Sequence, residues 1–366
     1  MPYSTSTALP TCADPRTRAP PSHRPGNGDP VRASVLQIAV RPDEPADERR
    51  ARVGDLVRRQ DASDLVVLPE LWTVGAFAFD AFHEHAESLD GPTAREMSAA
   101  AAQARVWLHA GSVVERGPAG ELYNTSLLFG PDGRLRRTYR KIHRFGFDRG
   151  EATLLARGVE TVTAVLDGDA TTGPATGPTA NPASGPTPGP ATGSAAGPAT
   201  GSAAGSAAGP ATGPTAGPAT GSAAGPTAGP AAGSTAGPAV GLTVGFATCY
   251  DLRFPEQFRL LVDAGAELFL VPAGWPAARR AHWSLLARAR AVESQAYVLA
   301  CGTAGTHAGV EQAGHSVVVD PWGEVVAEAG TDEETLVVDL DPALVAKTRA
   351  EFPALRDRVL GVPALR

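Results

Sequence analysis

Short apolar runs alternate with longer amphipathic segments along most of this chain, and the two patterns predict interleaved strands and helices. Two Pro-X-Gly turns, Pro131–Gly133 and Pro321–Gly323, each separate two strand-like runs and predict hairpins. The predicted strands are Ser34–Val40, Leu65–Leu68, Leu108–Glu115, Thr125–Gly130, Leu135–Tyr139, Thr161–Leu166, Val240–Thr248, Glu267–Pro272, Ala296–Cys301, Ser316–Val319, Glu324–Ala327 and Leu336–Leu340. The predicted helices are Asp47–Gln60, Thr93–Ala104, Pro255–Ala264, Ala281–Gln295 and Pro342–Ala350. This alternation indicates a mixed sheet covered by helices, which an αββα sandwich satisfies.

A low-complexity tract at residues 169–239 repeats Gly, Pro, Ala, Thr and Ser. Between Ala170 and Val240 it has no charged or aromatic residue, so it cannot bury a core and is predicted to be flexible. The strand-like segments on either side, Thr161–Leu166 and Val240–Thr248, are predicted to pair as a hairpin in which the tract replaces the turn. A long loop there costs little stability, because closure entropy rises only logarithmically with length.

The domain organisation follows from this tract and from the first residues of the chain. Residues 1–30 are rich in Pro, Ser, Thr and Arg and lack the apolar core of a secretory signal, so they are predicted to be a disordered tail. One domain is predicted over residues 31–366, interrupted by the insertion at 169–239.

Composition narrows the class of protein. The net charge is −7 and no basic block stands out, which argues against nucleic acid as a partner. No apolar run is long enough to span a bilayer, so no membrane association is expected. The three cysteines, Cys12, Cys249 and Cys301, are too few and too scattered for a disulfide framework, which favours a reducing, cytoplasmic location. No cluster has zinc-ligand spacing, and no metal or cofactor is expected.

Four residues are candidates for chemistry. Cys249 follows an apolar strand and precedes a helix, a position where nearby backbone N–H groups can stabilise an oxyanion and favour a thiolate. Glu70 follows a buried strand, where active sites of α/β proteins gather. Lys141 is one of only two lysines, with Lys347, in a chain that otherwise uses arginine. Taken singly, each has an ordinary alternative: a buried structural cysteine for Cys249, a charge at a helix N-terminus for Glu70, a solvated charge for Lys141 and a surface charge for Glu151.

Together these residues resemble one family, the nitrilase superfamily of carbon–nitrogen hydrolases. The matching segments are Leu68-Pro-Glu70, Tyr139-Arg-Lys-Ile-His143, Cys249-Tyr-Asp-Leu-Arg-Phe-Pro-Glu256 and the helix Ala287–Gln295, which has Ser294 where Asn is usual. The spacing between them suits the family once the tract is subtracted. The resemblance implies an α+β fold, a four-layer αββα sandwich of two mixed sheets covered by helices.

The resemblance also implies a role for each residue. Cys249 is the nucleophile that forms a thioester, and Glu70 is the general base. Lys141 holds the thiolate and, with the backbone N–H of Tyr250, the oxyanion. Glu151 matches the second glutamate of the family less closely and would orient the substrate or Lys141. Neither metal nor cofactor is implied.

Two further segments resemble ω-amidases, which hydrolyse small α-keto acid amides such as 2-oxoglutaramate: Glu70–Ala78 and Gly274–Trp283. Trp275 and Arg253 are candidates for substrate contact, and Arg279 or Arg280 for binding an anionic substrate. The partner expected is therefore a small amide, with ammonia and an acid as products.

Other functions stay open from the sequence alone. One alternative is hydrolysis of an N-carbamoyl amino acid or another aliphatic amide, and a second is a catalytically silent binding module. Family members commonly dimerise, so a homodimer or higher homo-oligomer is expected.

Overall fold

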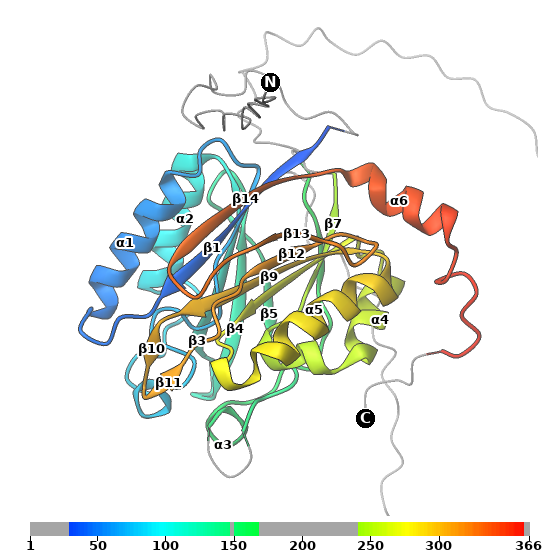
Figure 1. The fold of residues 1–366 in the computed structure, drawn as a ribbon. Helices are drawn as coiled ribbons and strands as arrows, with labels where there is room; N and C mark the ends of the chain where they lie inside the picture. Colours follow the sequence, from blue (N-terminus) through cyan, green and yellow to red (C-terminus); the bar gives the residue numbers. More distant parts are fainter. Residues whose placement is uncertain (1–28, 147–149, 168–240, 362–366) are drawn as a thin grey trace, which may run out of the picture. The chain divides into compact units, whose positions relative to one another are not determined.

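The computed structural model describes residues 29–146, 150–167 and 241–361, all of which belong to one compact unit (Figure 1). Nearly all of the predicted tail at residues 1–30, and the whole predicted tract at 169–239, lie outside the described residues. Twelve strands are linked by hydrogen bonds into one network, which has two halves.

The first half has parallel strands at its centre and antiparallel strands at its edges. Its strands β1, β2 and β3 are parallel, whereas β14, β4 and β5 are antiparallel to their neighbours. The order is β14 (Glu334–Leu340), β1 (Val31–Ala39), β2 (Leu65–Val67), β3 (Trp107–Arg116), β4 (Leu122–Phe129) and β5 (Leu135–Arg140).

The second half is built in the same way. Its strands β7, β8 and β9 are parallel, whereas β6, β12 and β13 are antiparallel to their neighbours. The order is β6 (Thr163–Val165), β7 (Thr243–Phe246), β8 (Leu268–Ala273), β9 (Tyr297–Ala304), β12 (Val317–Val319) and β13 (Val325–Glu328). The halves meet where Ile38 and Ala39 of β1 pair with Thr303 and Ala304 of β9. Both halves are therefore mixed, as predicted.

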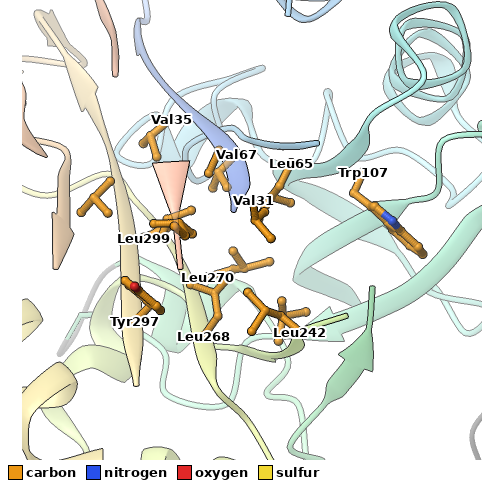
Figure 2. Packing of buried hydrophobic residues seen from close by; sticks show 14 of the residues in the cluster. Val31, Val35, Leu65, Val67, Trp107, Leu242, Leu268, Leu270, Tyr297 and Leu299 are labelled. Carbon is orange, nitrogen blue, oxygen red and sulfur yellow. The ribbon is translucent and has the colours of Figure 1, made fainter. Parts of the chain in front are cut away.

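The central strands bury side chains on both faces. In β1, Val31, Ala33 and Val35 belong to an inner core, whereas Leu36 and Ile38 belong to a separate outer core. Such continuous apolar sequence is typical of parallel strands covered on both sides. In Figure 2 the inner faces of the two halves pack against each other, with Val31, Val35, Leu65 and Val67 from one half and Leu268, Leu270, Tyr297 and Leu299 from the other.

Helices cover the outer face of each half. The outer core of the first half contains side chains from α1 (Ala46–Arg58) and α2 (Pro92–Ala104), and that of the second contains side chains from α4 (Pro255–Asp263) and α5 (Arg280–Ser294). Figure 1 shows the two helix pairs on opposite sides of the strands. The layers therefore run helix, sheet, sheet, helix, which confirms the α+β fold and the predicted αββα sandwich. A last helix, α6 (Pro342–Glu351), follows β14, and none of the described helices is long and apolar enough to span a bilayer.

The strands that flank the insertion pair as predicted. Ala164 of β6 lies opposite Val244 of β7 in an antiparallel register. Both hairpins predicted from the Pro-X-Gly turns are also present, as β4–β5 and β12–β13.

Several short elements are absent from the prediction. They are the 3-10 helices η1 (Phe79–Ala81), η2 (Cys249–Arg253) and η3 (Ala277–Arg279), the single-turn helix α3 (Glu151–Leu154), and the small hairpin of β10 (Thr306–His307) and β11 (Val310–Glu311). They are too short for a hydrophobic period to develop. Three of them, η2, η3 and α3, carry residues of the site described next.

Candidate active site

Glu70 lies just beyond the end of β2 and is fully buried, with 1% of its surface exposed. The chain here runs very close to β3, since a Cβ atom added to Gly111 would lie 1.9 Å from the carbonyl oxygen of Pro69. Gly111 also has a φ of +65°, which other residues adopt only with strain. A glycine in β3 therefore permits the approach that places Glu70.

Lys141 follows β5 and places its ammonium group between two carboxylates. Its Nζ donates to Oε1 of Glu70 and to Oε2 of Glu151, both at 2.7 Å. Burial alone lowers the pKa of Lys141, but the charges of Glu151 and Glu70 outweigh it, so the pKa is raised well above its ordinary value. The two carboxylates therefore favour the charged form of Lys141.

Asn124 of β4 joins the same two carboxylates from another side. Its Nδ2 donates to Oε1 of Glu70 at 2.8 Å and to Oε1 of Glu151 at 2.7 Å. Backbone N–H groups complete the shell, with Gly274 donating to Oε2 of Glu70 and Phe145 donating to Oε2 of Glu151, each at 2.8 Å. Buried charges need such compensation, and here every carboxylate oxygen has a donor.

Glu151 is the first residue of α3 and is buried. Burial raises its pKa, Lys141 lowers it, and Glu70 raises it again, with a net result above the ordinary value. The structure thus places Glu151 beside Lys141, where it is held by Lys141, Asn124 and Phe145. Of the two predicted alternatives, this geometry fits orienting Lys141.

Cys249 begins η2, shortly after the end of β7, and has a left-handed φ of +49°. Thr248 and Asp251 form a capping box around it, in which the Thr248 side chain and the Asp251 side chain each bind the other's backbone. The thiol donates to the carbonyl oxygen of Gly274 at 3.8 Å. The strand-to-helix turn predicted from the sequence is present, and the 3-10 helix η2 lies between β7 and the predicted helix, which is α4.

Asp251 connects this turn to the segment that carries Lys141. It is completely buried and accepts from the Tyr139 hydroxyl at 2.6 Å and from the Thr248 N–H at 2.8 Å. It also accepts from the backbone N–H of His143 at 3.0 Å, and the His143 ring lies within 2.8 Å. One carboxylate therefore fixes the turn at Cys249 against residues on both sides of Lys141, namely Tyr139 and His143.

The thiol of Cys249 does not have the electrostatic setting expected from the sequence. Burial raises its pKa, the charge of Glu70 raises it further, Lys141 lowers it, and a hydrogen bond with Glu70 adds to the rise. The net pKa lies well above the ordinary value, so the expectation that Lys141 and a helix N-terminus hold a resting thiolate is wrong. Burial is the largest cause, and the charge of Glu70 raises the pKa more than Lys141 lowers it.

A pocket of about 370 Å³ opens onto these groups. Its lining includes Glu70, Lys141, Glu151 and Cys249, together with all three further candidates from the sequence, namely Tyr250, Trp275 and Arg253. The remaining wall residues are Ala76, Phe77, Phe145, Gly274, Pro276 and Arg279.

The structure separates the two arginines proposed for anion binding. Arg279 lines the pocket, with its guanidinium carbon 5.4 Å from the centre of the Phe145 ring. Arg280 is not among the lining residues, and its guanidinium lies 3.0 Å from Nε2 of His315.

Sequence reasoning missed Asn124, Asp251 and the aromatic wall formed by Phe77 and Phe145. Asn124 left a usable signal, because it is a polar amide inside the strand-like run Leu122–Phe129. The two phenylalanines had none, since isolated aromatic residues are common in cores. Cys301 is in the inner core, and its thiol donates to the carbonyl oxygen of Leu36 at 3.2 Å. Among the described residues, no group of His, Cys, Asp or Glu is arranged to hold a metal ion.

Comparisons with known proteins identify the family of this chain. The model of the Carbon-nitrogen hydrolase family matches residues 32–350. The chain is 32% identical to 2-oxoglutaramate amidase of Paenarthrobacter nicotinovorans over 89% of its length and 88% of that protein. It is 29% identical to human Omega-amidase NIT2 over 80% of its length and 82% of that protein.

Solved structures show the same fold. XC1258 of Xanthomonas campestris, a CN-hydrolase superfamily protein, matches with a TM-score of 0.66 and 26% identity over 91% of this chain and 99% of its own. Nit3 of Saccharomyces cerevisiae, a nitrilase superfamily member, matches with a TM-score of 0.63 and 24% identity over 91% of this chain and 97% of its own. The chain therefore belongs to the carbon–nitrogen hydrolase family and has the fold of the nitrilase superfamily.

Proposed function

We propose that this carbon–nitrogen hydrolase is an ω-amidase that releases ammonia from 2-oxoglutaramate or a similar short α-keto acid amide. One observation carries the proposal. The thiol of Cys249 lines a pocket beside a buried cluster in which Lys141 is held between Glu70 and Glu151. This cluster provides a nucleophile, a base and a cation within one small volume.

The first half of the reaction forms a thioester. Because the thiol rests in its protonated form, Glu70 takes its proton as the sulfur attacks the amide carbon. The resulting tetrahedral oxyanion is stabilised by the Lys141 ammonium and by the backbone N–H of Tyr250, at the start of η2, where helical N–H groups have no partner inside the helix. Glu70 returns the proton to the nitrogen, the C–N bond breaks, and ammonia leaves.

The second half hydrolyses the thioester. Glu70 takes a proton from a water molecule, whose oxygen attacks the thioester carbon. The same two donors stabilise the second oxyanion. The C–S bond then breaks, the sulfur leaves as thiolate and recovers its proton from Glu70, and the acid departs.

Asn124 and Glu151 act on the position of the other groups. Both side chains are buried. Asn124 donates to the carboxylates of Glu70 and Glu151, and Glu151 accepts from Lys141. We assign them to holding Glu70 and Lys141 in register, because a small displacement of a reacting group is costly in rate.

The substrate assignment rests on the relatives named above and on the pocket. Two of those relatives carry the names 2-oxoglutaramate amidase and Omega-amidase. Four aromatic residues and two arginines line the pocket. A short substrate with one carboxamide and one carboxylate suits both features.

The test is ammonia release by the purified protein from 2-oxoglutaramate, simple aliphatic amides and N-carbamoyl amino acids. We expect 2-oxoglutaramate to have the highest kcat/KM and Cys249→Ala to abolish release. A preference for N-carbamoyl amino acids would replace the substrate assignment and leave the chemistry intact. Absence of turnover with the whole panel would favour a silent binding module.

Two further expectations also stay proposals. We propose a cytoplasmic location, supported by the free, buried thiols of Cys249 and Cys301, which suit a reducing compartment. We also propose that the protein forms a homodimer or higher homo-oligomer, which light scattering on the purified chain should reveal. Neither nucleic acid nor membrane is proposed as a partner.

A further inference from the structure

Two guanidinium groups line the pocket without a carboxylate partner. Within residues 29–146, 150–167 and 241–361, neither Arg253 nor Arg279 forms an ion pair, although both line the pocket that holds the buried acids. Other arginines of the fold do pair, as Arg140 does with Glu115 and Arg290 with Glu293. Arginines that face a pocket with their charge uncompensated are suited to bind an anionic ligand.

The distribution of charge orients such a ligand. The catalytic cluster holds two carboxylates, Glu70 and Glu151, against the single ammonium of Lys141. An anionic group of the substrate is repelled there, because like charges in a poorly solvated site repel each other strongly. A neutral carboxamide is not repelled. The arginines can bind the substrate carboxylate away from that cluster. The carboxamide end of the substrate is therefore directed to the cluster and the carboxylate end to the arginines.

The two arginines differ in what already holds them. The Nη2 atom of Arg253 lies 3.2 Å from Nδ1 of His282, and its guanidinium carbon lies 5.0 Å from the Trp275 ring centre. The guanidinium of Arg279 lies over the face of Phe145 and makes no hydrogen bond with the residues that the structure describes. All five of its N–H donors are therefore available to a ligand.

We propose that Arg279 selects anionic substrates by binding the substrate carboxylate while the carboxamide reaches Cys249. Arg253 contributes a second positive charge from its fixed position. This inference rests on the proposed function and adds to it the residue that separates α-keto acid monoamides from neutral amides of the same length.

The test compares Arg279→Met with Arg280→Met. The second is a matched control, because Arg280 is the next residue, is exposed and does not line the pocket. For each variant, kcat and KM are measured with 2-oxoglutaramate and with pentanamide, its uncharged five-carbon counterpart. Thermal melts establish that the variants are folded.

We expect Arg279→Met to reduce the preference for 2-oxoglutaramate over pentanamide, as a ratio of kcat/KM, by roughly 10- to 100-fold, the value of a charge-assisted hydrogen bond. The change should lie mainly in KM for 2-oxoglutaramate. Arg279→Lys, which keeps the charge, should recover part of it, and Arg280→Met should leave the ratio unchanged.

Three outcomes overturn the inference. They are an unchanged ratio in Arg279→Met, an equal loss with both substrates, and an equal shift in Arg280→Met. A parent enzyme that hydrolyses pentanamide but not 2-oxoglutaramate refutes the proposed function instead, so the two failures are distinguishable.

Discussion

The hydroxyl of Tyr139 donates to Oδ2 of Asp251 across 2.6 Å, although the two residues are 112 positions apart in the chain. Tyr139 belongs to the strand that leads to Lys141, and Asp251 to the helical turn that starts at Cys249. This bond crosses from one half of the sandwich to the other. It therefore fixes the distance between Lys141 and Cys249.

Asp251→Asn should damage both stability and turnover. An amide presents one acceptor oxygen where the carboxylate presents two, and its NH₂ group would face the donors of either Thr248 or His143. We expect the free energy of unfolding to fall by about 1–3 kcal/mol, measured by urea denaturation. We also expect kcat to fall by roughly tenfold or more, because displacing a reacting group lowers the rate of the reaction. An unchanged kcat in a destabilised variant would show that Asp251 serves the fold alone.

Lys141→Arg should inactivate the enzyme despite keeping the charge. Both carboxylate oxygens lie 2.7 Å from Nζ in a fully buried site, which leaves no space for a planar guanidinium. We expect kcat to fall by roughly 100-fold or more, the usual effect of losing an oxyanion donor. Lys347→Arg is the control, since Lys347 is exposed and remote from the pocket lining, and it should retain full activity. Comparable activity in the two variants would contradict the role given to Lys141.

Asn124 offers a test of the charge balance. Asn124→Asp places a third carboxylate beside Glu70 and Glu151, so the pKa of Glu151, already raised, should rise further. The acidic limb of the pH–kcat profile should therefore move to higher pH. Asn124→Leu removes the same donor without adding charge, and should lower kcat with a smaller movement of that limb. Equal profiles for the two variants would mean that charge at this position is unimportant.

His307 should make stability depend on pH. Burial, with the nearby charge of Arg49, lowers its pKa from the ordinary 6.5 to about 4. The unfolded chain therefore takes up a proton at this histidine at higher pH than the folded protein does. The contribution of neutral His307 to the free energy of unfolding is complete above pH 6.5 and is lost as pH falls towards 4.

The variant His307→Leu should reduce the loss of unfolding free energy between about pH 7 and pH 4.5 by about 2 kcal/mol, measured by urea denaturation at each pH. Part of the loss should remain, because burial also lowers the pKa of His109, to about 3. The same substitution at His83, which is exposed, is the control and should leave the loss as in the parent protein. An identical loss in His307→Leu and the parent would contradict the prediction.

Most regular elements follow from the sequence, because β1, β8 and β9 carry apolar runs and α1 and α5 carry amphipathic patterns. The hairpin across the insertion also follows, since Thr161–Leu166 and Val240–Thr248 are recognisable strands once the tract is set aside. The pairing of β1 with β9, which joins the two halves, does not follow, because it depends on contacts between distant segments.

The site divides in the same way. Glu70, Lys141 and Cys249 lie in short motifs, and Glu151 matches the family less closely. The structure brings all four predicted residues to one pocket. The raised pKa of Cys249 could not be predicted, because it depends on burial and on two carboxylates that the sequence places far apart. Asn124 illustrates the same limit, since only the folded strands bring its amide to both acids.

The most direct measurement is the mass of the cysteine peptides after acid quenching during turnover of 2-oxoglutaramate. The mechanism predicts an acyl adduct on the peptide that contains Cys249, none on the peptide that contains the core residue Cys301, and loss of both adduct and ammonia release in Cys249→Ala. Ammonia release that persists in Cys249→Ala, with no acyl adduct on any cysteine of the parent enzyme, would contradict the account.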